Sequence, residues 1–467
     1  MNKNGVSEIN TQTRIETDSL GDVHVPVDAL WGAQTQRAID NFPVSGQPMP
    51  SAFISAVALV KQTAAEANAS LGLLDNGRCE AIAEACQALI RGEYADQFPV
   101  DRYQTGSGTS TNMNVNEVIA AIAASNGVEM HPNDHVNMSQ SSNDVIPTAI
   151  HLSSVIGVQE RLIPALTHLR GVIYEREALF SEQVKTGRTH LMDAMPITLG
   201  QELRTWREQI HAAEKRLDAA ANELLAVPQG GTAVGTGVNA LPEFSRQFVK
   251  FLKANTSYSF RSMEHKFVGL SAVDGPVALS AQLRGLGIVL TKIANDLRWM
   301  NSGPIHGLAE ITLPALQPGS SIMPGKVNPV IPESVAMVGA QIMGLDSANA
   351  VAGQSGNFQL NVMLPLIGAN LLDMIGLLGN ATSMLADKAI RGFSVNTDTL
   401  DAGVRRNPVL VTALNPEIGY SLASEIAKEA YKTGRPVIDV AEEMSGLGRE
   451  RLEELMDPLK LTRGGVA

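Results

Sequence analysis

The chain has 467 residues, of which 44% are hydrophobic, 18% are charged and only 4% are aromatic. A chain of this length is expected to form two or three domains with a sizeable core, and its composition favours closely packed helices over sheets. The 48 acidic residues outnumber the 36 basic ones, which excludes the basic surface that nucleic acids or anionic lipids require. An anionic ligand must therefore be held by a local site.

The N-terminal sequence and the cysteines predict a cytoplasmic protein. Residues 1–21 contain neither the apolar stretch of a secretory signal nor the Arg-rich amphipathic pattern of a transit peptide. We expect no membrane span, because no apolar run approaches the length of one. Cys79 and Cys86 lie seven apart on one expected helix face and are interpreted as thiols of a reducing compartment, without a disulfide.

The first predicted elements are a short hairpin and a pair of helices. The sequence RIETDSLGDVHV at 14–25 predicts two strands joined by a turn at Leu20–Asp22. Residues 51–74 and 76–92 each place apolar side chains three and four apart, and the second stretch opens on Asn76 as a capping residue. We expect these two helices to form an αα-hairpin.

Long helices dominate the centre of the chain. Pro164 should kink the first of them, and Pro196 is expected to open the second. The sequence from 275 to 297 is apolar around most of a helix circumference, so other subunits are needed to bury it. Shorter helices are expected after about residue 398, at 419–434 and 449–459. The predicted long helices are 145–182, 196–226, 273–301, 333–352 and 365–391.

These patterns indicate an all-α protein with a central bundle of long helices shared between subunits and a small β content near the N-terminus. The predicted domains are a mostly helical N-terminal domain at 1–143, the long-helix bundle at 144–397 and a small helical domain at 398–467.

Three loops share a cluster of Gly, Ser and Thr followed by Asn, at 105–114, 230–239 and 319–328. Hydroxyls, side-chain amides and the free N–H groups of a following helix are donors that bind carboxylates or phosphates. The first and third loops are expected to run into helices. Capping and turn chemistry is the alternative explanation of each loop taken singly. The loop at 230–239 is expected to follow a helix rather than a strand, which argues against a dinucleotide fingerprint.

Two further polar segments precede predicted helices. In SQSSND, at 139–144, Ser141, Ser142 and Asn143 fit either helix caps or ligand donors. In GRTHLMDAMP, at 187–196, we expect Thr189 and His190 to lie in a loop before a long helix. A helix start favours the neutral form of a histidine, which suits a base, although a lone loop histidine is more often structural.

The segment HPNDH at 131–135 offers potential metal ligands in His131, Asp134 and His135. Pro132 interrupts the cluster and no distant cluster has zinc-site spacing, so a polar turn or a secondary anion site is favoured over a metal site. The sequence also contains no nucleophile elbow of a hydrolase and no P-loop.

Taken together, these motifs resemble the class II fumarate hydratases of the fumarase/aspartase superfamily. Aspartases are the nearest alternative, because they share the loop at 319–329 and also NPVIPE (328–333) and QLNV (359–362). Aspartases carry Gln where this chain has His190, so His190 favours water over ammonia as the leaving group. The resemblance spans almost the whole chain, and its segments are 31–38, 104–118, 131–144, 187–194, 230–239 and 320–329.

The resemblance implies a homotetramer of chains with three mostly helical domains each, with active sites built from three subunits. The implied reaction is the reversible anti addition of water to fumarate, giving (S)-malate through an aci-carboxylate intermediate, as in the tricarboxylic acid cycle. It implies no metal and no cofactor. An aspartase and a catalytically silent, dicarboxylate-binding helical tetramer are the alternatives.

The resemblance also implies residue roles. Ser320 would be the base that takes the carbon-bound proton, with Lys326 and nearby N–H donors stabilising its alkoxide. His190, paired with Glu333, would act on the water side. The implied substrate-binding residues are Ser107, Gly108, Thr109, Ser141, Ser142, Asn143, Thr189, Ser321, Lys326, Val327 and Asn328. The implied second anion site is His131, Pro132, Asn133 and Asp134.

Three residues depart from common patterns of the family. Met138 stands where many relatives have Lys, Ile305 where many have Arg, and Gln359 where many have Glu. No basic residue lies just before His131 either. These departures bear mainly on the second anion site, while the implied catalytic set is intact.

Overall fold

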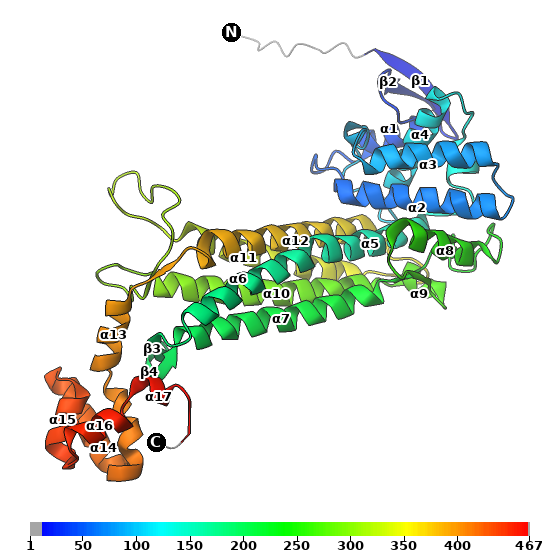
Figure 1. The fold of residues 1–467 in the computed structure, drawn as a ribbon. Coiled ribbons are helices and arrows are strands. Elements are labelled where there is room, and N and C mark those ends of the chain that lie inside the picture. Colours follow the sequence, from blue (N-terminus) through cyan, green and yellow to red (C-terminus); the bar gives the residue numbers. More distant parts are fainter. Residues whose placement is uncertain (1–11, 466–467) are drawn as a thin grey trace, which may run out of the picture. The chain divides into compact units, whose positions relative to one another are not determined.

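The computed structural model describes residues 12–465 and shows a mostly helical fold (Figure 1). These residues form two compact units, each made of three segments of the chain. The first unit takes the residues up to Leu162, Arg216–Arg284 and Gln341–Leu377, and the second takes Ile163–Lys215, Gly285–Ala340 and the residues from Leu378 onward. The predicted domains, by contrast, are continuous stretches of the chain, at 1–143, 144–397 and 398–467. That division stays a prediction.

The first unit opens with the predicted hairpin. Strand β1 (Thr13–Asp18) pairs antiparallel with β2 (Gly21–Pro26), and Asp18 lies opposite Gly21. The turn is therefore formed by residues 19 and 20, and the predicted turn at Leu20–Asp22 lies too late. Gly21 has a φ of 110°, which only glycine adopts readily, and this places it where strand and turn meet.

Helices α2 (Ser51–Ser70) and α3 (Asn76–Ile90) lie side by side as the predicted αα-hairpin (Figure 1). The cap of α3 is Asp75 rather than the predicted Asn76, because the Asp75 carboxylate accepts a hydrogen bond from the Arg78 N–H. Both cysteines lie on α3 as free thiols, and burial raises the pKa of Cys86. The other helices wholly in this unit include α1 (Ala33–Asn41), α4 (Thr109–Ser125), α5 (Ser142–Gly157), α8 (Phe244–Thr256) and α9 (Lys266–Ser271).

The predicted helix at 145–182 is interrupted where Pro164 was expected to disturb it. A π-helical turn at Val158–Leu162 separates α5 from α6 (Ile163–Leu179). Pro164 has no N–H to donate to the carbonyl four residues earlier, so the α-helical bonding pattern cannot continue through this point. The helix is therefore two helices joined by an irregular turn.

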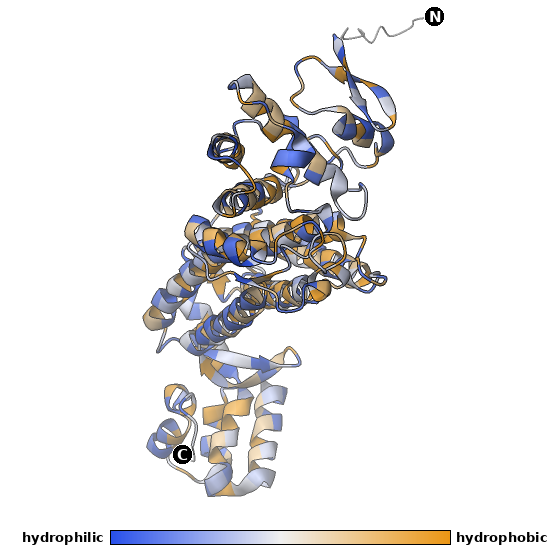
Figure 2. Ribbon diagram, turned by 90° about the vertical axis from the view of Figure 1, so that its right-hand side faces the viewer, coloured by the Kyte–Doolittle hydropathy of each residue, from blue (hydrophilic) through white to orange (hydrophobic). Residues whose placement is uncertain are grey.

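Four long helices pass from one unit into the other along the chain: α7 (Leu199–Glu223), α10 (Asp274–Met300), α11 (Val330–Gly353) and α12 (Leu364–Leu385), the last followed by a π-turn at Ala386–Ile390. In the first unit, the Ser280 hydroxyl donates to Asp346, and Asn349 donates to Ser280 and accepts from Asn370, which joins α10, α11 and α12. In the second unit, the indole N–H of Trp206 joins α7 to Asp296 on α10. Figure 2 shows hydrophobic and hydrophilic residues alternating along the helices.

Three helical stretches, Asp274–Met300, Val330–Gly353 and Leu364–Ile390, are long and apolar enough to cross a membrane by length and composition. The prediction that no apolar run approaches that length is therefore wrong. The same stretches carry the buried Ser280, Asp346, Asn349 and Asn370 side chains, which bond to one another between the helices.

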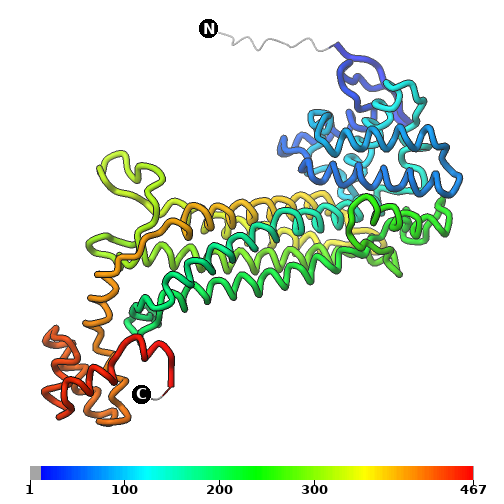
Figure 3. Tube along the Cα trace, viewed as in Figure 1, coloured from blue at the N-terminus to red at the C-terminus, as the bar shows by residue number. Residues whose placement is uncertain are grey.

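The second unit contains a hairpin that was not predicted. Strands β3 (Val184–Thr189) and β4 (Met192–Thr198) pair antiparallel, with an irregularity between Thr186 and Arg188. Pro196 lies in β4, so the helix predicted from Pro196 begins only at Leu199. The irregular segment 301–329 connects α10 to α11 and is drawn as the yellow-green tube in Figure 3.

The C-terminal part of the second unit has a small core of its own, which includes Leu414, Ile426, Val440 and Leu452. The predicted short helices there are present, although the helix predicted from 419 already begins at Asn415, with a break at Gly419. Its helices are α13 (Thr397–Arg406), the 3₁₀ turn Pro408–Leu414, α14 (Asn415–Thr433), α15 (Val437–Ser445), α16 (Arg449–Leu455) and α17 (Pro458–Leu461). Two pairs of two-residue strands complete the fold: β5 (Ala226–Val227) with β6 (Arg261–Ser262), and β7 (Ile311–Thr312) with β8 (Ser394–Val395).

A buried histidine on α5 makes the stability of the first unit depend on pH. The His151 Nδ1 donates to the carbonyls of Ala226 (2.8 Å) and Leu224 (3.1 Å), and burial lowers the pKa of His151 to about 4. Between pH 6.5 and 4 the unfolded chain binds a proton that the folded chain does not, so stability falls as the pH falls, by about 1.4 kcal/mol per pH unit. Asparagine keeps an N–H donor but does not titrate. We therefore expect chemical denaturation to show wild type losing stability relative to His151→Asn below pH 6.5. A difference that is constant with pH would contradict this.

Candidate functional site

The donor loop at 105–114 meets the polar segment 139–144 in the first unit through a chain of hydroxyl groups. The Ser107 hydroxyl lies 2.8 Å from that of Thr109, which in turn lies 2.7 Å from the Ser142 hydroxyl. Thr109 is the first residue of α4 and Ser142 is the first residue of α5. Helix starts present free N–H groups and a partial positive charge. The hydroxyls therefore lie where an anion is favoured.

Two glycines allow the first loop to lie this close to its neighbours. A Cβ on Gly106 would lie 1.7 Å from the carbonyl oxygen of Val362, and one on Gly108 would lie 2.9 Å from the Ile146 side chain of α5. Gly108 also has a φ of 72°, in the left-handed region. The loop thus packs against both α5 and the segment 359–362, which the sequence shares with aspartases.

The segment 139–144 caps α5, as the alternative explanation of its polar residues predicted. The Ser141 hydroxyl accepts from the Asn143 N–H, and Asp144 accepts from the Ser141 N–H at 2.9 Å, which completes a capping box. The Ser142 hydroxyl and the Asn143 side-chain amide form none of the capping hydrogen bonds. Capping and ligand binding are therefore compatible here, because different groups serve each.

The loop at 230–239 lies next to this cap. The second Asp144 oxygen accepts from the N–H groups of Gly230 and Thr232, both at 2.9 Å, and the Asn143 amide donates to the Ala233 carbonyl at 2.8 Å. The two-residue strand β5 precedes the loop, so the prediction that it follows a helix directly is wrong. Sequence reasoning missed Asp144 as a link between the two loops, because the local sequence SQSSND indicates only a helix cap.

Thr189 and His190 lie at the tip of the hairpin β3–β4 in the second unit. His190 and Leu191 form the turn and have φ values of 55° and 60°. His190 is exposed, and a whole strand separates it from α7. The predicted position before a long helix, and the argument that a helix start favours neutral His190, are therefore wrong. The turn presents the imidazole to the surroundings instead of burying it.

A cluster of buried charges anchors the base of this hairpin. The Lys185 ammonium, with a side chain only 2% exposed, lies 2.6 Å from Glu202 and 2.7 Å from Glu310. The Arg188 guanidinium donates to the other Glu310 oxygen at 2.6 Å. Glu310 directly precedes β7, so the cluster ties the hairpin to β7 within the second unit. Sequence reasoning missed these residues, because nothing in their local spacing brings 185, 202 and 310 together.

The loop at 319–329 is closed at its base. The Gly319 N–H donates to the Lys326 carbonyl at 2.9 Å, and the Asn328 amide donates to the Gly319 carbonyl at 2.6 Å. A Cβ on Gly319 would lie 2.2 Å from the Lys326 oxygen, so this closure requires glycine. Inside the loop, the Ser320 hydroxyl oxygen accepts from the N–H groups of Ile322 (3.2 Å) and Met323 (3.0 Å).

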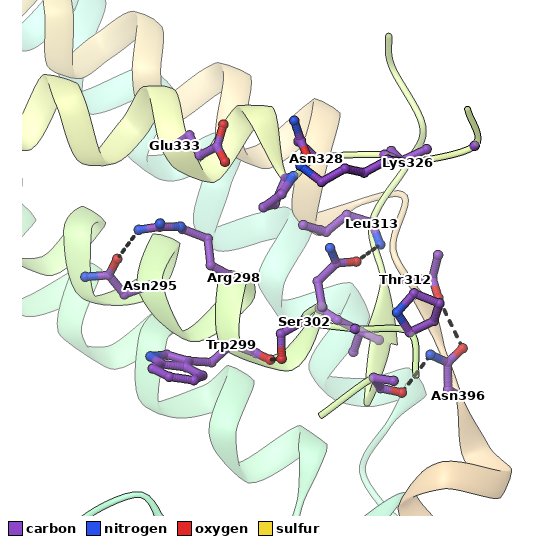
Figure 4. A pocket seen from close by; sticks show the side chains of 18 residues that line it. Asn295, Arg298, Trp299, Ser302, Thr312, Leu313, Lys326, Asn328, Glu333 and Asn396 are labelled. Atoms are coloured by element: carbon purple, nitrogen blue, oxygen red, sulfur yellow. Dashed lines mark hydrogen bonds between the residues drawn. The ribbon is translucent and has the colours of Figure 1, made fainter. Parts of the chain in front are cut away.

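A cavity of about 790 Å³ in the second unit is lined by part of the predicted set. Lys326, Asn328 and Glu333 lie along one side of it, and Arg298 and Thr312 contribute to its wall (Figure 4). Glu333 lies in the first turn of α11, which begins at Val330, three residues before the predicted start. Val327 also lines the cavity, whereas Ser320, Ser321, Thr189 and His190 do not.

The predicted His190–Glu333 pair is not formed within the single chain. In the span from 12 to 465, neither side chain has a hydrogen bond or an ion pair, and the same holds for the Lys326 ammonium. The pairing therefore stays a prediction.

The candidate second anion site folds as a polar turn. Pro132–Val136 forms a π-helical turn, and the His131 Nδ1 accepts from the Asp134 N–H and lies 3.2 Å from the Asp134 carboxylate. The structure brings one cation near it, because the Arg78 guanidinium donates to the carbonyl of Glu129. In the part of the chain that the structure describes, no group of three or more His, Cys, Asp and Glu side chains could hold a metal ion. Anion binding here stays a prediction.

None of the three departures from the family pattern lines the cavity. Ile305 is 83% exposed, Gln359 is exposed, and neither lines it. Met138 lies in the first unit, where its carbonyl accepts from Asn68.

Comparison with known proteins gives matches over nearly the whole chain. A family model described as lyase matches residues 21–344, and one described as fumarase C C-terminus matches residues 410–463. The class II fumarate hydratase of Xylella fastidiosa is 58% identical over 455 residues, which are 97% of this chain and 96% of the relative. The class II fumarate hydratase 2 of Pseudomonas aeruginosa is 56% identical over 98% of this chain and 100% of its own length. Among solved structures, the recombinant class II fumarase from Schistosoma mansoni is similar with a TM-score of 0.94 and 37% identity, covering 97% of this chain and 99% of that one.

Proposed function

Because the chain belongs to the class II fumarate hydratase family of lyases, we propose that it catalyses the reversible hydration of fumarate to (S)-malate, a step of the tricarboxylic acid cycle. The structural observation that supports this most directly is the hydroxyl chain from Ser107 through Thr109 to Ser142 at the starts of two helices. Such a donor cluster suits a dicarboxylate, and class II fumarate hydratases act without a metal.

In the direction of dehydration, Ser320 as an alkoxide takes the proton from malate C3. The electron pair of the C–H bond moves into the neighbouring carboxylate and forms an aci-carboxylate, whose extra negative charge must be stabilised by donors. The N–H groups of Ile322 and Met323 already point at the Ser320 oxygen, and hydrogen bonds to an ionised group favour that form. Lys326 adds a positive charge on the same loop.

The second half of the reaction breaks the C2–O bond. His190, protonated and paired with Glu333, gives a proton to the departing hydroxyl, so that water and fumarate are the products. In hydration the same group takes the proton from the attacking water. Ser107, Gly108, Thr109, Ser141, Ser142, Asn143, Thr189, Ser321, Val327 and Asn328 complete the proposed carboxylate-binding set.

The proposed assembly is a cytoplasmic homotetramer whose active sites each draw on three subunits. Helix α11 supports this, because only 28% of its most apolar stretch is buried within the chain. The Met337 and Val351 side chains on this helix are 67% and 59% exposed. Apolar helix faces of this kind need a partner. The exposed hairpin tip with His190 is likewise free to meet Glu333 of another subunit.

The proposed function predicts that purified protein treated with a chelator consumes fumarate and forms malate. Loss of the ultraviolet absorbance of the conjugated double bond follows the reaction, and separation of the products identifies malate. Tight binding of fumarate without turnover would instead support a dicarboxylate-binding protein and contradict the enzyme.

A further inference from the structure

Asp144 is a buried carboxylate that does more than cap a helix. It is fully buried, and its Oδ1 accepts from the Ser141 N–H in the capping box of α5. Its Oδ2 has no part in the cap and accepts from two other N–H groups, those of Gly230 and Thr232. A carboxylate has acceptor sites on both oxygens, so one side chain serves both purposes at once.

The loop that Oδ2 holds has a backbone conformation that needs support. Thr232 is 3% exposed and has a φ of 53°, a left-handed conformation that is rare for a β-branched residue. Such conformations persist only where the surroundings hold them. The loop's own side chains do not supply that support, since in the described residues the Gln229 amide and the Thr232 hydroxyl are buried without a hydrogen-bond partner. Besides Asp144, the Ser245 hydroxyl contacts the loop, through the Gln229 carbonyl.

The supported loop in turn orients a proposed substrate-binding residue. The carbonyl of Ala233, next to Thr232, accepts from the Asn143 Nδ2 at 2.8 Å. This contact decides which end of the Asn143 amide carries the remaining free N–H, the group that a substrate carboxylate needs. Asn143 follows Ser142 of the hydroxyl chain directly, so the orientation of its amide is set beside that chain.

We propose that Asp144 is a positioning residue, which holds the Gly230–Ala233 backbone so that the Ala233 carbonyl orients the Asn143 amide for substrate. The proposal rests on the proposed function, because Asn143 binds substrate only if that function holds. The loop at 230–239 thereby has the role of orienting the Asn143 amide, which its Gly- and Thr-rich sequence alone did not indicate. Lys61 is also fully buried, and its ammonium donates to Asn137 and Gln140 and attracts the Asp144 charge.

The variant Asp144→Asn separates the two duties of the carboxylate. An amide has one acceptor oxygen, so it can keep the bond to the Ser141 N–H or the bonds to Gly230 and Thr232, but not both. A displaced Asn143 amide should lower kcat/KM for fumarate by about 10²-fold, the effect of a small misplacement of a binding group. The matched control is Glu117→Gln, because that buried carboxylate accepts from the N–H groups of Gly32, Gln34 and Thr35 and serves no donor loop. We expect the control to stay within about twofold of wild type in kcat/KM.

A double-mutant cycle with Asn143→Ala tests whether Asp144 acts through Asn143. We expect Asp144→Asn to change kcat/KM by less than about twofold in the Asn143→Ala background, because residues that act as one unit are not additive. An equal loss in both backgrounds would overturn the proposal.

Gly237→Ala is a milder variant that leaves Asp144 intact. A Cβ there would lie 3.1 Å from the Gly230 carbonyl, in a residue with a φ of 78°. Its smaller loss should also vanish with Asn143→Ala, and a loss that persists would overturn the proposal.

Amide hydrogen exchange tests the contact without using activity. In Asp144→Asn, the peptides that cover 228–236 should exchange faster than in wild type, while those that cover 32–36 should not change. Unchanged exchange at 228–236 would overturn the proposal. If wild type fails to hydrate fumarate while exchange still rises, the proposed function is wrong and the support of the loop by Asp144 is upheld.

Discussion

Replacing His190 by asparagine is expected to lower kcat for fumarate hydration by about 10²–10⁴-fold, the usual contribution of a general acid or base. The structure makes asparagine the right substitute. His190 forms the turn of β3–β4 with a φ of 55°, and asparagine is among the residues that tolerate this conformation. The turn and the hairpin should therefore persist, and only the titratable imidazole is lost. Steady-state kinetics in both directions measure the effect.

The matched control for this prediction is His168→Asn on α6. The His168 imidazole lies 2.8 Å from the Asp387 carboxylate, so it is a histidine beside an acid, as is proposed for His190, but it is outside the proposed site. Its variant should retain kcat within about twofold. Full activity of His190→Asn would show that another group protonates the departing hydroxyl.

Replacing Ser320 by alanine is expected to lower kcat by about 10²–10⁴-fold as well, because the proposed base that takes the C3 proton is removed. The two N–H groups that now point at the Ser320 oxygen would lose their acceptor, but both lie in an exposed loop where water can replace it. The fold should therefore be unaffected. Exchange of the malate C3 proton with solvent deuterium, followed by NMR, measures the step that Ser320 performs.

Ser347→Ala on α11 is the control for this second prediction. The Ser347 hydroxyl is exposed and donates to the Met343 carbonyl of the same helix, so its removal changes no proposed site residue. Both C3 exchange and turnover should stay at the wild-type level. If Ser320→Ala still exchanges the C3 proton at the wild-type rate, the base is a different residue.

The two hairpins show which parts of the fold could be predicted from the sequence. In β1–β2, polar and apolar residues alternate around Gly21, and local rules predict the hairpin, although they place its turn too late. In β3–β4 the turn is His190–Leu191, which has no Gly, Asn or Asp to indicate a left-handed turn. Pro196 there resembles a helix start but lies in a strand. The hairpin is held by the buried charges of Lys185 and Glu310, which are distant in sequence.

The site was predictable to a similar degree. The polar loops carry enough Gly, Ser and Asn to be recognised, although two of the helices after them begin earlier than predicted, at Ser142 instead of 145 and at Val330 instead of 333. What links the loops was not predictable, because the bonds from Asp144 to Gly230 and Thr232 join residues that are far apart along the chain. Contacts of this kind depend on tertiary packing and leave no local pattern.

One side-by-side measurement shows whether the enzyme eliminates water rather than ammonia. Metal-free protein is given malate in one reaction and aspartate in the other, and fumarate formation is followed by its ultraviolet absorbance. We expect a kcat/KM for malate that exceeds the value for aspartate by several orders of magnitude. A faster reaction with aspartate, with ammonia released, would contradict it.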